Sequence, residues 1–271
     1  MILFKSWGCL ILSICAAFTI CLAVSEKAGS EILSGVVNKE HIISRSGVVL
    51  NKDTGNPIAG ASVSIPAKGI ETKTNDYGEY RLDLPDERPL ILAVRAKGYK
   101  PFSLILEKNK SNSPMIIAIA EQERNEIIID TGLHHLGDNK YSDNSANSTD
   151  FSAPAAGPYY FKEFFIDSIE PQRSVLLKIG SIIGIDTKTA QSMRQSKVLT
   201  SSSTPVKVFF NSQHVGEIDY NGNDHIIKIP SELVRTNSYN HVRIETGINI
   251  NSRSRKDYDD IEFIHLILEF K

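Results

Sequence analysis

Residues 47–82 read GVVLNKDTGNPIAGASVSIPAKGIETKTNDYGEYRL, and this stretch decides the fold of the first half of the chain. Within it, Ala61, Val63 and Ile65 alternate with serines, so one face of an extended strand points inward. Two turn sequences, 53–57 (DTGNP) and 75–78 (NDYG), combine glycine, which adopts positive φ, with Asn or Asp, which bonds its own backbone. Strands spaced this closely, with no helical period between them, predict a small β-sandwich.

Turn and strand signatures follow one another in a fixed order between residues 44 and 120. They are Gly47-Val48-Val49, Asp53-Thr54-Gly55, Pro57-Ile58-Ala59-Gly60-Ala61, Val63, Thr72, Thr74-Asn75-Asp76, Gly78, Tyr80, Leu82 and Gly98-Tyr99. In this order they resemble the carboxypeptidase regulatory-like domain. The resemblance implies a transthyretin-like, seven-stranded sandwich of the prealbumin type that serves as a spacer or accessory module. It does not imply carboxypeptidase activity, because nothing in the chain resembles the separate α/β unit that carries the zinc ligands of such peptidases.

A second β-rich segment, 126–271, follows the charged run EQERNE at 121–126. Residues 137–158 are rich in Gly, Ser, Asn, Asp and Pro and predict a long loop, after which strands resume. The run VKVFFN at 206–211, followed by Val215-Gly216, resembles the strand–turn–strand of galactose-binding-like jelly rolls, although Ser212 stands where that turn commonly has glycine. Residues 189–195 predict a short helix. The fold class we expect is therefore all-β, with a transthyretin-like sandwich followed by a jelly-roll-like sandwich.

The N-terminal segment has the pattern of a secretory signal peptide. Residues 1–25 contain one charge, Lys5, then a mostly apolar core and the small residues Ala23-Val24-Ser25. An uncleaved anchor and a lipoprotein are the alternatives, but residues 7–24 are barely long enough to span a bilayer and isoleucine precedes both Cys15 and Cys21. Residues 26–43 are predicted to be a tether. We expect an exported protein (periplasmic, secreted or cell-surface) with no membrane span after cleavage of the signal.

Export would also remove the residues on which several kinds of chemistry depend. All three cysteines and the only tryptophan lie within residues 1–25, so the remaining chain has no thiol nucleophile or thiolate metal ligand. The formal net charge of −2 and the absence of a basic stripe argue against nucleic acid as a partner. The chain also lacks a nucleophile elbow, a P-loop and a glycine-rich dinucleotide turn. We therefore expect a protein that is not an enzyme.

One cluster of acidic residues is a candidate metal site. Asp257, Asp259 and Asp260 lie within four residues, and Asp138 lies at the other end of the predicted domain. Carboxylates are the hard oxygen ligands that Ca²⁺ prefers, so these four residues are the predicted ligands of a structural calcium. The alternative is that they are solvated turn residues and strand caps. His134 and His135 are adjacent, but neighbours on a strand point to opposite faces and do not easily share one ion.

Three functional hypotheses follow from these features, and the third is an enzyme that uses acidic residues on the jelly-roll loops. In the first, the jelly roll binds an extracellular glycan and the first sandwich acts as a spacer. In the second, the chain is a structural or assembly protein that contacts another surface protein and has no glycan ligand. The loss of tryptophan weighs against sugar binding, and the tyrosines that could replace it are Tyr141, Tyr159, Tyr160, Tyr220, Tyr239 and Tyr258.

Overall fold

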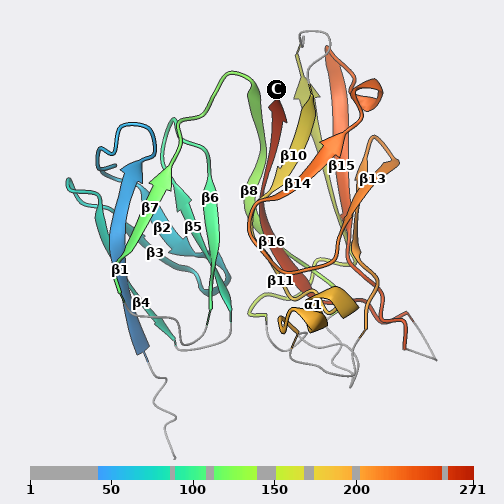
Figure 1. The fold of residues 1–271 in the computed structure, drawn as a ribbon, viewed down its shortest axis with the longest axis horizontal. Helices are drawn as coiled ribbons and strands as arrows, with labels where there is room; N and C mark the ends of the chain where they lie inside the picture. The colour runs from blue at the N-terminus through green and yellow to red at the C-terminus, as the bar shows by residue number, and fades with distance from the viewer. Residues whose placement is uncertain are drawn as a thin grey trace, which may run out of the picture. The chain divides into compact units, whose positions relative to one another are not determined.

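Two β-sandwiches follow one another along the chain (Figure 1). The computed structural model describes residues 42–85, 89–107, 113–138, 151–167, 174–196, 202–251 and 256–271, which belong to one compact unit, Glu40–Lys271. The predicted signal peptide lies outside the described residues, as does the predicted tether except for its last two residues, Ile42 and Ile43, which begin the first strand. Within the described residues, no helix has the length and apolar character needed to span a bilayer.

The first sandwich consists of a three-stranded sheet, β4-β1-β7, and a four-stranded sheet, β3-β2-β5-β6. Strands β1 and β7 run parallel, and the other pairs are antiparallel. These seven described strands agree with the seven-stranded sandwich that the sequence resemblance implies. Their bounds, with those of one 3-10 turn, are β1 (Ile42–Asn51), β2 (Ser62–Ile65), η1 (Pro66–Lys68), β3 (Ile70–Lys73), β4 (Glu79–Pro85), β5 (Leu90–Arg95), β6 (Phe102–Leu106) and β7 (Met115–Ile119).

The predicted turns hold this sandwich together through their side chains. The Asn51 carboxamide oxygen accepts the backbone N–H groups of Asp53 and Thr54, at 2.9 and 3.0 Å, which closes the turn after β1. The buried Thr74 hydroxyl donates to the carbonyl of Ile58 and accepts the N–H of Ala61. Backbone groups of the irregular segment before β2 are therefore paired inside the protein, as burial requires.

The second sandwich consists of a five-stranded sheet and a four-stranded sheet. In one sheet, β16 pairs with β8 along one edge and with β10 and β11 along the other, and β14 pairs with β10. The other sheet has the order β13-β12-β15-β9. The elements are β8 (Glu126–Leu136), β9 (Tyr159–Ile166), β10 (Val175–Ile179), β11 (Ile182–Ile183), α1 (Lys188–Ser192), β12 (Val206–Phe210), β13 (Gln213–Ile218), β14 (His225–Ile229), η2 (Ser231–Leu233), β15 (Ser238–Glu245) and β16 (Ile261–Phe270). The predicted short helix corresponds to α1.

Strand β16 is buried along its whole length, on both faces. The side chains of Phe263, Leu266 and Leu268 enter the core of the second sandwich, whereas Ile264 belongs to a separate apolar cluster on the opposite face. The change of phase occurs at a β-bulge, where His265 has a φ of +60°. This arrangement explains why the apolar residues of the segment do not follow one strict alternation.

The face of β16 that points away from its own core packs against the first sandwich. Ile91 and Ala93 of β5 contact Ile183 and Ile264 in a buried apolar cluster. As a result, the first five residues of β5 are buried although successive side chains alternate between its faces. The two sandwiches therefore share a buried apolar contact between one sheet of each.

Polar groups surround this contact and are paired across it. The buried Ser103 hydroxyl of β6 accepts the N–H of Ser181 at 2.9 Å, and the two serine hydroxyls lie 3.0 Å apart, within hydrogen-bond distance. The Asn223 side-chain oxygen accepts the hydroxyl of Ser181 (2.7 Å) and the backbone N–H of Ile105 (3.0 Å). An edge amide of the first sandwich is thus satisfied by a loop of the second.

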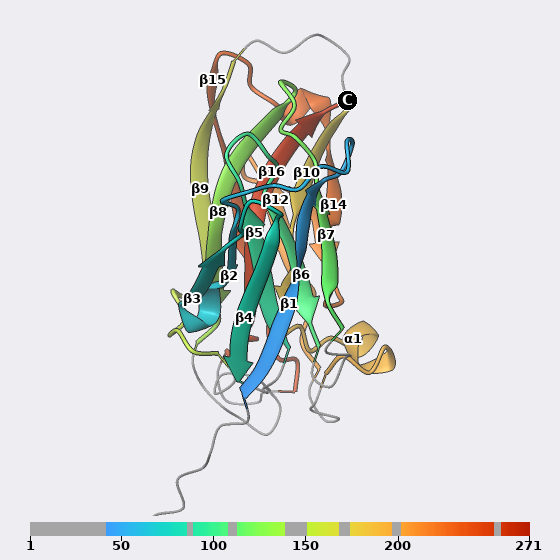
Figure 2. The ribbon, with the colours of Figure 1, turned by 90° about the vertical axis from the view of Figure 1, so that its left-hand side faces the viewer.

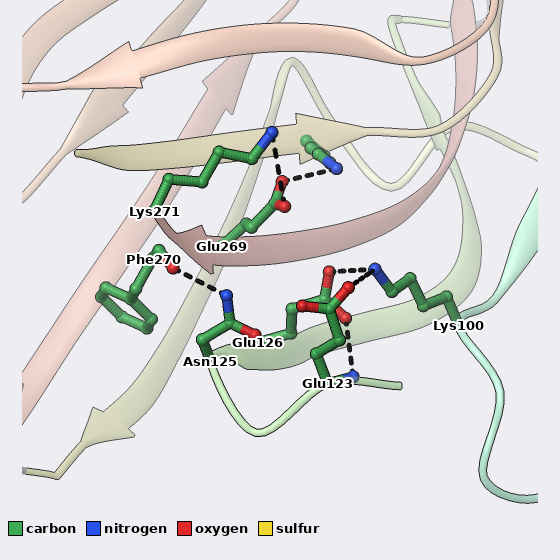
Figure 3. A network of polar contacts seen from close by, with 8 residues as sticks. Lys100, Glu123, Asn125, Glu126, Glu269, Phe270 and Lys271 are labelled. Atoms are coloured by element: carbon green, nitrogen blue, oxygen red, sulfur yellow. Dashed lines mark hydrogen bonds and ion pairs between the residues drawn. The ribbon is translucent and has the colours of Figure 1, made fainter. Parts of the chain in front are cut away.

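An ion pair connects the β5–β6 loop with the start of β8 (Figure 3). The Lys100 ammonium lies 2.6 Å from Glu126 Oε1 and 3.1 Å from Glu123 Oε1. Burial opposes the charge on Lys100, but the two carboxylates outweigh it and raise the pKa of Lys100. Residues 120–125 form the connector between β7 and β8. Within this connector, the Asn125 side chain donates to the carbonyl of Phe270 at 2.8 Å. The connector is therefore bound to both sandwiches.

Candidate functional site

The outer face of the sheet β13-β12-β15-β9 carries an exposed group of aromatic side chains. Tyr159, Phe161 and Phe165 of β9 are 57%, 51% and 45% exposed, and Tyr239 of β15 is 64% exposed. We call these four residues the aromatic face. Because side chains alternate along a strand, the residues between them, Tyr160, Phe164 and Ile166, point into the core instead. The apolar cluster between the two sandwiches involves the opposite sheet, so the first sandwich does not cover the aromatic face.

Cross-strand pairing brings the rings of the aromatic face together. Strands β9 and β15 lie side by side (Figure 2), with Phe165 opposite Tyr239 and Glu163 opposite His241. The ring centroids of Phe165 and Tyr239 are 5.3 Å apart, and the two rings are nearly perpendicular. The Phe161 ring lies 5.1 Å from the His241 ring. Edge-to-face and tilted pairs of this kind stabilise neighbouring strands and hold the rings in place.

Charged side chains adjoin the aromatic face on the inner strands of the sheet. The Arg243 guanidinium lies 4.1 Å from the centre of the Phe209 ring, in a cation–π contact. The same side chain forms a 2.6 Å ion pair with Glu245. Its charge is therefore compensated twice, by a carboxylate and by a ring.

A buried amide network fixes the end of the sheet near the aromatic face. Asn240 is fully buried in β15, and its side-chain oxygen accepts the Nδ2–H of Asn211 at 2.7 Å. Asn211 and Ser212 form the tight turn between β12 and β13, with φ of +46° and +69°. Asparagine suits this conformation, and the pairing of β12 with β13 compensates for the strain at Ser212, which replaces the glycine expected there.

The tyrosines considered as sugar platforms have different positions in the structure. Tyr159 and Tyr239 belong to the aromatic face, whereas Tyr160 is buried and donates its hydroxyl to Asp130 at 2.8 Å. Tyr220 is 40% exposed but belongs to a loop beside His225. Tyr258 is partly buried, and Tyr141 lies outside the described residues. Sequence reasoning missed Phe161 and Phe165, because aromatic residues occupy both phases of YYFKEFF and the pattern does not show which set lies outside.

Several acidic side chains are buried just before and at the start of β16. Asp259 Oδ2 accepts hydrogen bonds from the Ser203 hydroxyl (2.7 Å) and the backbone N–H of Asp186 (3.0 Å). Burial, and then the negative charge of Asp186, raises the pKa of Asp259 well above its usual range. A carboxyl group in this environment favours its protonated form, so the strand can bury it without a full charge.

His135 compensates another of these acids. Its Nε2 lies 3.0 Å from Asp260 Oδ1, and its Nδ1 lies 2.6 Å from the carbonyl oxygen of Ala153. Burial alone would lower the pKa of His135, but hydrogen bonds to the two acceptors raise it. Both nitrogens face acceptors, so the doubly protonated imidazolium satisfies the site best. His134, the neighbouring histidine, instead lies 3.3 Å from Asp130, so the two rings have separate partners.

The four predicted calcium ligands likewise have separate partners. Asp257 Oδ2 accepts the Asn249 side chain at 2.9 Å, and Asp138 Oδ2 lies 3.4 Å from the backbone nitrogen of Tyr258. Asp259 and Asp260 are engaged as described above. Within the described residues, no group of three or more His, Cys, Asp or Glu side chains is arranged to hold a metal ion. The calcium site therefore stays a prediction.

One part of the chain matches a known protein family. Residues 45–129 match the CarboxypepD_reg-like domain. This match agrees with the resemblance drawn from the turn signatures at 44–120, and it extends into β8. No curated protein sequence matches the chain.

Several solved structures are similar at low sequence identity. A glycosyl hydrolase family 2 member from Bacteroides cellulosilyticus DSM 14838 is 12% identical, with a TM-score of 0.30 over 54% of this chain and 21% of that chain. A β-D-glucuronidase from Dictyoglomus thermophilum is 12% identical, with a TM-score of 0.29 over 55% and 29%. A candidate carbohydrate-binding protein from Bacteroides uniformis ATCC 8492 is 10% identical, with a TM-score of 0.23 over 84% and 99%. This chain thus corresponds to less than a third of the length of either glycosidase. At scores this low, the fold assignment rests on the strands of the chain itself.

Proposed function

We propose that this chain is an exported, non-catalytic surface protein whose second sandwich binds carbohydrate through the aromatic face. The first sandwich serves as the accessory module that holds the second. One observation carries the proposal: four aromatic rings lie together on an ordered sheet face, each about half exposed or more. Exposed rings cost solvation energy, and a contiguous group of them is typical of a binding surface.

The chemistry of the aromatic face suits a sugar. A pyranose ring has an apolar side of C–H groups that can lie on an aromatic ring, and an equatorial rim of hydroxyls. Phe161 and Phe165 offer flat apolar surfaces, and the hydroxyls of Tyr159 and Tyr239 add polar groups at two exposed positions. Around the rings, His241 and Glu163 provide groups that donate or accept hydrogen bonds. Binding sites commonly combine apolar surface with a few such polar groups.

Binding to soluble polysaccharides in affinity gel electrophoresis tests the proposal. The variants are Phe161→Ala and Tyr239→Ala, and we expect each to weaken binding about tenfold, because each removes one stacking surface. Tyr77→Ala is the control, since Tyr77 is an aromatic residue on the first sandwich that is more exposed than either Phe161 or Tyr239. Equal binding by all three variants and the parent protein, or no binding by the parent to any polysaccharide, contradicts the proposal.

The second candidate function is assembly with another surface protein through the same face. The phenylalanines favour it, since Phe161 and Phe165 have no polar group to match a hydroxyl-rich ligand. Cross-linking on intact cells, followed by identification of the linked protein, separates the two functions. Assembly predicts a protein partner that is lost in Phe161→Ala, with no polysaccharide binding by the purified parent protein.

A further inference from the structure

The aromatic face has one carboxylate in the middle of its rings. Glu163 is exposed on β9 between Phe161 and Phe165 and lies opposite His241 of β15. Among the residues that the structure describes, no cation forms an ion pair with Glu163. A ligand seated on the rings would therefore meet this negative charge directly.

The cations of the same sheet face lie beside carboxylates. Arg243 is bound by Glu245 and by the Phe209 ring. Lys207 of β12 lies opposite Glu245 on one side and opposite Glu217 on the other. The outer face thus carries two cations and three carboxylates, and its formal charge is −1 when the histidines are neutral. The charged residues are Arg243, Lys207, Glu163, Glu217 and Glu245. Near the rings the electrostatic potential is therefore negative, which repels anions and attracts hydrogen-bond donors.

The face is also elongated. Tyr159 and Phe165 are six residues apart on one strand, which corresponds to about 20 Å at about 3.3 Å per residue. A single sugar ring covers only part of that length. A ligand that contacts Tyr159, Phe161 and Phe165 together must therefore be a chain of several sugar units.

We infer that the aromatic face takes an uncharged, extended glycan chain, and that Glu163 both accepts its hydroxyl hydrogen bonds and excludes anionic polysaccharides. The inference rests on the proposed function and adds the ligand class and the residue that selects it. Hydrogen bonds from hydroxyls to a carboxylate are stronger than those between neutral groups, so Glu163 contributes affinity for neutral sugars. A uronate or sulfate placed on the rings would bring a second negative charge beside it, which disfavours binding.

Two polysaccharide probes of opposite type test this inference. The purified protein is titrated with galactomannan, which is neutral, and with polygalacturonate, which is anionic, at low and at high salt. We expect binding to galactomannan alone, with little dependence on salt. Glu163→Gln should lose about tenfold in affinity for galactomannan, the usual effect of removing a charged hydrogen-bond acceptor. Glu163→Lys should gain salt-sensitive binding to polygalacturonate, because the charge that excludes it is reversed.

The control variant is Glu217→Gln, which removes a carboxylate from the same sheet on β13, the opposite edge strand. We expect it to bind galactomannan as the parent protein does. Melting temperatures of all variants establish that they are folded. Mannose, as the free monosaccharide, should not displace galactomannan at concentrations where a short mannan chain does.

The outcomes separate this inference from the proposed function. If the parent protein binds polygalacturonate as tightly as galactomannan, or Glu163→Gln changes nothing, the ligand class is wrong while carbohydrate binding stands. Displacement by free mannose at the same concentration as by the chain rejects the extended ligand. If neither polysaccharide binds, the proposed function fails and this inference fails with it.

Discussion

The buried histidine at the β16 bulge makes the second sandwich sensitive to acid. His265 is 2% exposed, and within the described residues neither of its ring nitrogens has a hydrogen-bond partner. Burial, together with the charge of Arg95, lowers the pKa of His265 from 6.5 to about 4. As the pH falls, the unfolded chain therefore binds a proton at His265 at a higher pH than the folded chain does. The corresponding stability is fully present above about pH 6.5 and is lost as the pH falls toward 4.

The size of the effect follows from the two pKa values. A difference of about 2.5 pKa units, at about 1.4 kcal/mol per unit, corresponds to about 3 to 4 kcal/mol once the pH lies below both pKa values. By pH 4.5 most of this loss has occurred, and we expect about 2 to 3 kcal/mol. That is a large part of the 5 to 15 kcal/mol that stabilises a typical domain.

The comparison uses His265→Asn, because asparagine does not titrate and tolerates the positive φ at this position. Urea unfolding is followed by far-UV circular dichroism at several pH values between 7.5 and 4.5. The parent protein should lose about 2 to 3 kcal/mol more than the variant over this range, whatever their difference at pH 7.5. His214→Asn, at an exposed histidine of β13, should keep the parental pH dependence. Parallel curves for the parent and His265→Asn would refute the reasoning.

Three further outcomes can be measured on the same protein. Lys100→Met should lower the free energy of unfolding by about 3 kcal/mol, because it leaves the buried carboxylate of Glu126 without its cation. Arg81→Met breaks the exposed pair with Asp83 and should change the free energy of unfolding by less than about 0.5 kcal/mol. Equal effects of the two variants in urea unfolding contradict this prediction. Gly47→Ala should lower the free energy of unfolding by about 2 to 3 kcal/mol, since an added Cβ would lie 2.1 Å from the backbone oxygen of Met115 and force β1 and β7 apart. An unchanged midpoint in urea unfolding argues against this prediction. If calcium is held near Asp257 and Asp259, EDTA lowers the melting temperature and added calcium restores it, so an unchanged melting temperature rejects the ion.

The strands were predictable because local chemistry specifies them. In the first sandwich, the turns built on Asn51 and Asn75 use side-chain bonds to backbone N–H groups within a few residues, so the sequence pattern carries the information. The change of phase in the last strand was also visible. The cause of this phase change was not predictable, because a bulge and burial on both faces give the same irregular pattern of apolar residues.

The aromatic face was not predictable for a different reason. In YYFKEFFI, aromatic or aliphatic residues occupy both phases of the strand, so period-two alternation does not tell which set faces the core. Tyr160 and Phe164 enter the core, and Phe161 and Phe165 remain outside, because of how β9 pairs with β15. The same limit applies to the acids before β16. Asp257 and Asp259 are neighbours in sequence, but their partners, Asn249 and Ser203, come from separate loops that only the fold brings near them.

The position of β16 along the chain sets the order in which the protein can be completed. This strand pairs with β8, β10 and β11, and all three precede it in the sequence. During synthesis, which proceeds from the N-terminus, the sheet has no centre until residues 261–270 have emerged. Until then the outer side of β5, with Ile91, also lacks its cover. The first sandwich can therefore form early, whereas the second and the contact between the two form last and together, once residues 261–270 are available to pair.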